Sequence, residues 1–120
     1  MSKCILIVDD DPVVVELVKH TLEAKGYDLT TAQNGIEALG ELKKRTPDLI
    51  LLDVQMPKMD GYTFMMEKSK IPAFAGVPVI VLTSLGKTEP MFKRHGVKAY
   101  LLKPVNTQEL LDKIQAVVPA

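Results

Sequence analysis

The feature that most constrains the fold of this chain is a set of short apolar runs that alternate with segments in which apolar residues recur at helical spacing. Four runs are almost wholly apolar: Cys4–Val8, Leu49–Leu52, Val79–Leu82 and Ala99–Leu102. A weaker alternating run, Asp28–Ala32, predicts a fifth and more exposed strand. Strands that are apolar throughout are typical of a parallel sheet covered by helices on both faces.

Four intervening segments carry residues at helical spacing. The first lies between Pro12, which suits a first helical turn, and Gly26, which suits a helix end. Asn34 and Asn106 each stand three residues before a Glu, the spacing of a capping box, and predict the starts of the second and the last helix. The residues that mark these segments are Val14, Leu17, Val18, Thr21 and Leu22; Ile36, Leu39 and Leu42; Phe64, Met65 and Met66; and Leu110, Leu111, Ile114, Val117 and Val118.

Strands that alternate with helices predict repeated βαβ units with right-handed crossovers, and therefore a doubly wound α/β fold. The length of 120 residues is close to the commonest domain size, and no linker or low-complexity tract divides the chain. We expect residues 1–120 to form a single domain. The stretch between Pro90 and Gly96 predicts one further helix of about two turns.

The charge balance and the cysteine content exclude several classes of protein. Fifteen Lys and Arg residues balance fifteen Asp and Glu residues, which gives no general attraction to nucleic acid or to an anionic membrane. The single cysteine forms no internal disulfide, and the first apolar run is too short for a signal peptide or a membrane span. We expect a cytoplasmic protein without membrane insertion or direct nucleic-acid binding.

Polar residues follow four of the predicted strands at one edge of the sheet. Ligands of open parallel sheets bind at the carboxyl ends of the strands, so these residues are the candidates for a site. They are Asp9, Asp10 and Asp11 after the first strand, Asp53 after the third, Thr83 and Ser84 after the fourth, and Lys103 and Pro104 after the fifth. Carboxylates, a hydroxyl and an ammonium are the parts of a phosphoryl-transfer site.

Each of these residues alone has a purely structural explanation. Asp9–Asp11 precede a helix, whose N-terminus favours negative charge, and Asp11 before Pro12 fits a helix cap. Thr83 suits a strand end and Lys103 a surface position. Asp53 is harder to explain in this way, because a carboxylate at the end of a buried strand is costly without a cation. The conjunction of four strands at one edge favours a site.

The residue types also indicate the chemistry. Clustered carboxylates repel one another, and oxygen ligands suit Mg²⁺, with Mn²⁺ as a substitute, better than Zn²⁺. An aspartate accepts a phosphoryl group as a nucleophile and forms an aspartyl phosphate. A lysine and a metal ion neutralise the phosphoryl oxygens, and a hydroxyl donates a hydrogen bond to one of them.

In this order and spacing the motifs resemble those of the response-regulator receiver domains of two-component signalling systems, and in particular the stand-alone chemotaxis-type regulators. The resemblance extends throughout the chain. It rests on Ile-Leu-Ile-Val-Asp-Asp-Asp-Pro at 5–12, Asp-Leu-Ile-Leu-Leu-Asp-Val-Gln-Met-Pro at 48–57 with Asp60-Gly61, Pro-Val-Ile-Val-Leu-Thr-Ser at 78–84, and Tyr-Leu-Leu-Lys-Pro at 100–104.

The resemblance implies a flavodoxin-like receiver fold with the strand order 2-1-3-4-5, and it implies a role for each matching residue. Asp53 is the expected phosphoacceptor. The expected metal ligands are Asp9, Asp10, Asp53 and the backbone carbonyl of Gln55. The expected phosphate-binding and switch residues are Thr83, Ser84, Lys103 and Tyr100, and a cis peptide bond is expected before Pro104.

The implied function is a phosphorylation-switched module that is not an enzyme in its own right, although it supports its own phosphotransfer and autodephosphorylation. It receives its phosphoryl group from a histidine kinase or a phosphotransfer protein and acts on an unidentified protein target. One alternative is a degenerate receiver that binds partners without phosphorylation, against which the intact Asp10, Asp53, Thr83 and Lys103 argue. Another is an Asp-nucleophile phosphatase, which places a second Asp where this chain has Gln55.

Overall fold

The computed structural model describes residues 3–53, 61–83 and 97–118, and of Thr83 it describes the backbone. The strands are β1 (Cys4–Val8), β2 (Asp28–Ala32), β3 (Leu49–Asp53), β4 (Val79–Thr83) and β5 (Val97–Leu102). They form one five-stranded sheet in the order β2-β1-β3-β4-β5, and all of its pairings are parallel. The predicted doubly wound α/β fold and its strand order are confirmed.

The helices are α1 (Pro12–Glu23), α2 (Gly35–Lys44), α3 (Gly61–Ser69), α4 (Pro72–Ala75) and α6 (Thr107–Val117). The sequence pattern did not predict α4, because a single turn is too short to show helical periodicity. It begins at Pro72 and buries Phe74. The helix expected between Pro90 and Gly96 lies outside the described residues. In the part of the chain that the structure describes, none of the helices has the length and apolar character that crossing a membrane requires.

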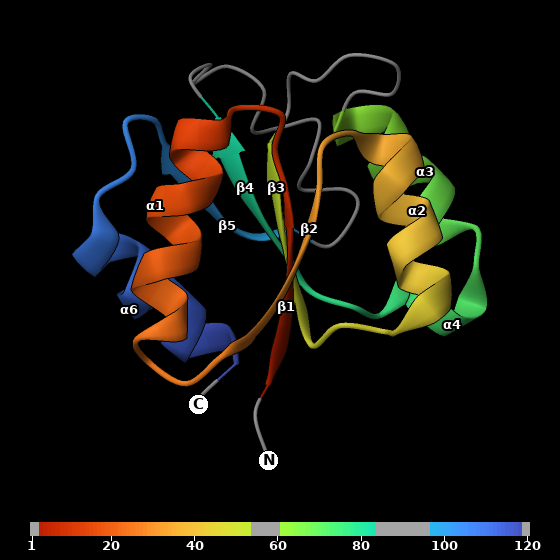
Figure 1. The fold of residues 1–120 in the computed structure, drawn as a ribbon. Helices are drawn as coiled ribbons and strands as arrows, with labels where there is room; N and C mark the ends of the chain where they lie inside the picture. Colours follow the sequence, from red (N-terminus) through yellow and green to blue (C-terminus); the bar gives the residue numbers. More distant parts are fainter. Residues whose placement is uncertain (1–2, 54–60, 84–96, 119–120) are drawn as a thin grey trace.

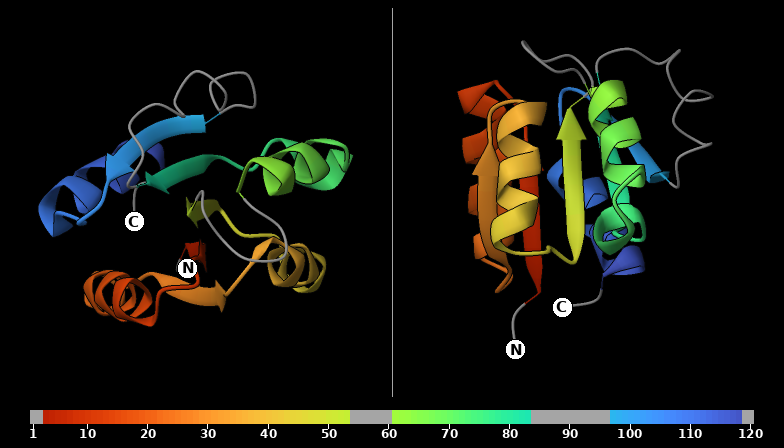
Figure 2. Two further views of the ribbon diagram at one scale, coloured as in Figure 1. Left: turned by 90° about the horizontal axis from the view of Figure 1, so that it is seen from above. Right: turned by 90° about the vertical axis from the view of Figure 1, so that its right-hand side faces the viewer.

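The helices cover both faces of the sheet, with α1 and α6 on one side and α2, α3 and α4 on the other (Figures 1 and 2). Successive strand residues point to opposite faces, so β1 contributes Ile5 and Ile7 to one core and Leu6 and Val8 to the other. Because both faces are covered, every residue of β1 and β3 is buried. This burial is the reason for the continuous apolar runs in the sequence.

Side-chain caps fix where α1, α2 and α6 begin. Asp11 Oδ1 accepts a hydrogen bond from the Val13 N–H at 2.9 Å. Asn34 and Asn106 accept hydrogen bonds from the N–H groups three residues on, at 2.9 and 3.0 Å, as their spacing predicts.

Three of the apolar residues that marked the helices do not reach the core. Leu17 is 42% exposed, Ile36 is 55% exposed and Met66 is 38% exposed. In α1 the buried residues are Val18 and Leu22, while α2 turns Ala38 and Leu42 inward and leaves Ile36 outside. The sequence pattern overestimated the width of the buried face of these helices. Each helix contacts the sheet along a face that is narrower than the arc its apolar residues cover.

Candidate functional site

The strand order places the candidate site at the carboxyl ends of β1 and β3. The chain passes from β1 to β2 on one side and then returns to β3 on the other side of β1, so the direction of winding reverses there. Open parallel sheets bind their ligands at such a reversal. Asp9 directly follows β1, and Asp53 is the last residue of β3. The two carboxylates therefore come from adjacent strands.

Asp9 is held in place from several directions. Its N–H donates to the Ala32 carbonyl at 3.1 Å, which extends the pairing of β1 with β2 by one residue. Its Oδ1 accepts from the Asp11 N–H at 2.9 Å. The side chain is fully buried, and Oδ2 receives no hydrogen bond of good geometry from the described part of the chain. The remaining contact of Oδ2 is an ion pair with Lys103.

Asp9, Asp10 and Asp53 form one acidic cluster. Their carboxylate oxygens lie within 4.8 Å of one another, with Asp9 and Asp53 buried and Asp10 exposed. Three carboxylates so close together repel one another strongly, and a divalent cation removes that cost. The oxygen-only donor set and the unsatisfied Asp9 Oδ2 fit a hard cation such as Mg²⁺. The cluster thus unites three of the four ligands expected from the sequence.

Lys103 contacts two members of this cluster. Its Nζ lies 3.0 Å from Asp9 Oδ2 and 3.3 Å from Asp53 Oδ1, and its side chain is 19% exposed. Burial alone lowers the pKa of the Lys103 ammonium. The close contact with Asp9 and the charges of Asp53 and Asp9 outweigh that effect and raise the pKa above its ordinary value. The lysine therefore remains a cation at neutral pH.

Asp11 has a different role from its two acidic neighbours. It caps α1 through Val13 and donates its N–H to Asp9, so it supports the cluster without belonging to it. The sequence alone did not decide whether the three aspartates cap a helix or form an acidic cluster. In the structure the run does both. Two carboxylates belong to the acidic cluster and one belongs to the helix.

The other candidate residues have mixed outcomes. The backbone of Thr83 ends β4 and pairs with Leu102, so its position is at the same edge. Tyr100 lies half-buried on β5 and packs against the core cluster on the α2–α3 face. The peptide bond between Lys103 and Pro104 is cis. Gln55 and Ser84 lie outside the described residues.

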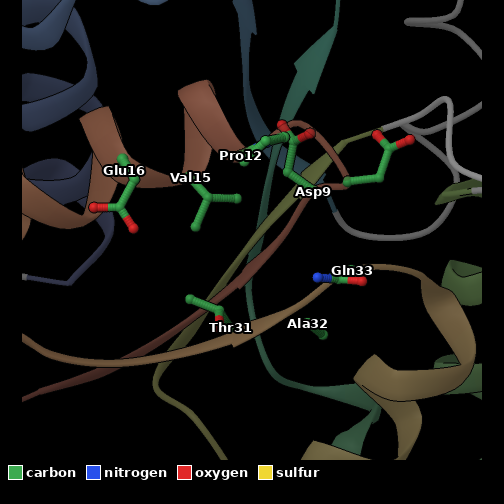
Figure 3. A pocket seen from close by; sticks show the side chains of 8 residues that line it. Asp9, Pro12, Val15, Glu16, Thr31, Ala32 and Gln33 are labelled. Carbon is green, nitrogen blue, oxygen red and sulfur yellow. The ribbon is translucent and has the colours of Figure 1, made fainter.

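Sequence reasoning did not single out a groove that borders the acidic cluster. The groove has a volume of about 400 Å³ and lies between the first turns of α1 and the end of β2 (Figure 3). Glu16, Thr31 and Gln33 line it beside Asp9 and Asp10. The one available signal was the position of Thr31 and Gln33 at the carboxyl end of β2, on the same edge as the other candidates.

Comparisons with known proteins agree with this geometry. The family model of the response regulator receiver domain matches residues 5–115. The chain is 37% identical over 116 residues to the DNA-binding dual master transcriptional regulator RpaA of Synechocystis, a match that covers 95% of this chain and 48% of RpaA. The chain spans about half the length of most of the curated relatives it matches.

Solved structures give the same result. The chemotaxis response regulator CheY4 of Vibrio cholerae superposes with a TM-score of 0.92 at 33% identity, covering 98% of this chain and 100% of that protein. The receiver domain of the sensor histidine kinase PA1611 of Pseudomonas aeruginosa, with a magnesium ion in its active-site cleft, superposes with a TM-score of 0.89 at 30% identity, covering 100% of both chains.

Proposed function

The chain belongs to the response regulator receiver domains, the phosphorylation-switched modules of two-component signalling, and from this premise we propose that Asp53 is its phosphoacceptor. The family expected from the sequence motifs is confirmed. The observation that carries the proposal is the pair of contacts that Lys103 Nζ makes with Asp9 and Asp53. A cation beside a nucleophilic carboxylate at a sheet edge is what a dianionic phosphoryl group requires.

In this proposal a carboxylate oxygen of Asp53 attacks the phosphorus of the donor. The new bond is the P–O bond of an aspartyl phosphate, and the bond that breaks is the P–N bond of a phosphohistidine, whose nitrogen leaves with the electron pair. Lys103 stabilises the negative charge of the phosphoryl oxygens. Hydrolysis of the aspartyl phosphate by water, which resets the module, belongs to the same proposal.

Asp9, Asp10 and Asp53 fit a bound divalent cation, as receiver domains bind Mg²⁺, and we propose that the Gln55 carbonyl completes the set. When bound, Mg²⁺ supplies neutralising positive charge at the phosphoryl oxygens. Mn²⁺, which shares the preference for oxygen ligands, is the proposed substitute. Asp9 and Asp10 would hold the cation through carboxylates that take no part in the new bond.

We propose that Thr83, Ser84 and Tyr100 report the state of Asp53. Phosphorylation places roughly −1.5 to −2 charges, with several strong acceptor oxygens, where one carboxylate stood. The single ammonium of Lys103 does not satisfy all these acceptors, so the Thr83 hydroxyl moves toward the phosphoryl group and draws the residues that follow it in the same direction. Tyr100 then turns into the vacated space. This is a population shift between two packings of one chain.

The proposed donor is a histidine kinase or a phosphotransfer protein, and the proposed output is a protein target that reads the altered surface. We propose that residues 1–120 act together as one receiver domain. A cytoplasmic location is part of the proposal, because Cys4 is a buried free thiol that suits a reducing compartment.

The decisive experiment is intact mass spectrometry after incubation with acetyl phosphate and Mg²⁺. Wild type gains one phosphoryl group, and Asp53→Asn, which keeps the size of the side chain, gains none. Asp48→Asn serves as the matched control, since Asp48 lies at the opposite end of β3. A wild-type chain that takes up no phosphoryl group, or an Asp53→Asn variant that takes up one, refutes the assignment.

A further inference from the structure

The groove beside the acidic cluster has two walls that are far apart in sequence. Pro12, Val15 and Glu16 come from the first turns of α1, and Thr31, Ala32 and Gln33 come from the end of β2. Figure 3 shows Glu16, Val15 and Pro12 facing Thr31, Ala32 and Gln33 across the groove, with Asp9 beside Pro12. Its volume of about 400 Å³ is within the range of binding pockets for small molecules and side chains.

The groove has an electrostatic preference of its own. Among the described residues that line it, none is basic and three are acidic: Asp9, Asp10 and Glu16. The contacts with Lys103 offset part of the charge of the acidic cluster, and a divalent cation at that cluster offsets more of it. Glu16 lies outside the cluster, so its charge remains available. The groove is therefore complementary to a cation.

The remaining lining defines the shape of that cation. Pro12, Val15 and Ala32 offer apolar surface, while Thr31 and Gln33 offer hydroxyl and amide oxygens as acceptors. A ligand with an aliphatic stem and a charged head matches this combination of apolar, acceptor and acidic surface. Lysine and arginine side chains have this build, because they pack their methylene groups on apolar surface and keep the charged head polar.

We infer that the groove receives a lysine or arginine side chain of the phosphodonor protein, with its charged head at Glu16. This inference rests on the proposed function, because any protein that delivers a phosphoryl group to Asp53 must cover the sheet edge onto which the groove opens. Glu16 acts in docking and touches no reacting atom. Its charge sets the rate of encounter and the strength of association, and it leaves the chemical step unchanged.

The first test uses a probe of the side chain alone, with Mg²⁺ saturating. Nα-acetyl-lysine methylamide shifts the amide resonances of Val15, Glu16, Thr31 and Gln33 in a saturable manner, and the uncharged norleucine analogue does not. Glu16→Gln weakens binding of the lysine probe about threefold, in line with one exposed charge pair, and Glu23→Gln at the far end of α1 leaves it unchanged. Equal shifts with both probes, or shifts confined to Asp9, Asp10 and Asp53, overturn the inference.

The second test uses phosphotransfer from a phosphorylated histidine kinase that labels the wild-type chain. Glu16→Lys raises KM on the order of tenfold with kcat unchanged, and the effect shrinks at high salt. Labelling by acetyl phosphate, which has no docking surface, stays the same, as does the kinase reaction of Glu23→Lys. An unaltered KM refutes the role of Glu16. Loss of labelling by acetyl phosphate in wild type refutes instead the assignment of Asp53.

Discussion

Lys103 Nζ lies 3.3 Å from Asp53 Oδ1, although the whole of strand β4 separates the strands that carry these two residues. Lys103 follows β5 at the edge of the sheet, and Asp53 ends β3 at its centre. The long side chain of Lys103 spans β4 and also reaches Asp9, which directly follows β1. One ammonium thus joins the ends of three strands, and its removal or deprotonation affects both the stability and the chemistry of the site.

Replacing Lys103 by Met removes the cation from two buried carboxylates. We expect the free energy of unfolding without metal to fall by about 3 kcal/mol, the usual cost of leaving a buried charge without its partner. Mg²⁺ then stabilises Lys103→Met more than it stabilises wild type, because the metal replaces the missing positive charge. Urea denaturation of both proteins with and without Mg²⁺ measures the difference. Equal stabilisation of the two proteins contradicts the prediction.

Replacing Asp10 by Asn removes one carboxylate from the acidic cluster. We expect Mg²⁺ affinity to fall by at least about tenfold, because replacing a group that only hydrogen-bonds to a metal ligand already costs about that much. The metal-free protein becomes more stable, because repulsion from Asp9 and Asp53 decreases. Isothermal titration calorimetry and thermal unfolding measure the two effects.

Asp11→Asn is the matched control for this prediction. It removes the same charge from the adjacent residue, and asparagine caps a helix as well as aspartate does. A similar loss of Mg²⁺ affinity in both variants indicates a general effect of charge and contradicts the ligand role of Asp10.

The raised pKa of Lys103 predicts how its contribution depends on pH. The ammonium stabilises the folded state fully at any pH below the ordinary lysine value of 10.5, and this contribution is lost as the pH rises through the higher pKa of the folded state. The difference in unfolding free energy between wild type and Lys103→Met therefore stays constant from neutral pH to about pH 10 and shrinks above it. A difference that shrinks already between neutral pH and about pH 9 contradicts the raised pKa.

Lys68 predicts the opposite dependence on pH. Its side chain is buried under α4 and donates to the Ala75 carbonyl at 3.2 Å, and burial lowers the pKa of its ammonium. Between this lowered pKa and 10.5 the unfolded chain binds more protons than the folded chain, so stability rises with pH. Wild type therefore gains stability relative to Lys68→Met as the pH rises through this window. Chemical denaturation of both proteins across this pH range measures the gain, and a difference in stability that does not change with pH contradicts the prediction.

The sequence alone determined the strands, the helices longer than one turn that the structure describes, and the edge of the sheet at which the candidate site lies. Apolar runs such as Leu49–Leu52 predict buried strands, because only a strand covered on both faces requires apolar residues at every position. Asn34 and Asn106 predict helix starts, because the cap is a contact between residues close in the chain. Local patterns also placed Asp53 directly after an apolar run.

Packing between distant segments decided the rest. Only the sheet order brings Lys103 to Asp9 and Asp53, and only the seating of α1 and α2 on the sheet leaves Leu17 and Ile36 exposed. The groove at Glu16 exists because the start of α1 lies across from the end of β2. A sequence pattern records how a residue relates to its neighbours in the chain, whereas the distance between two side chains depends on how the intervening strands and helices pack.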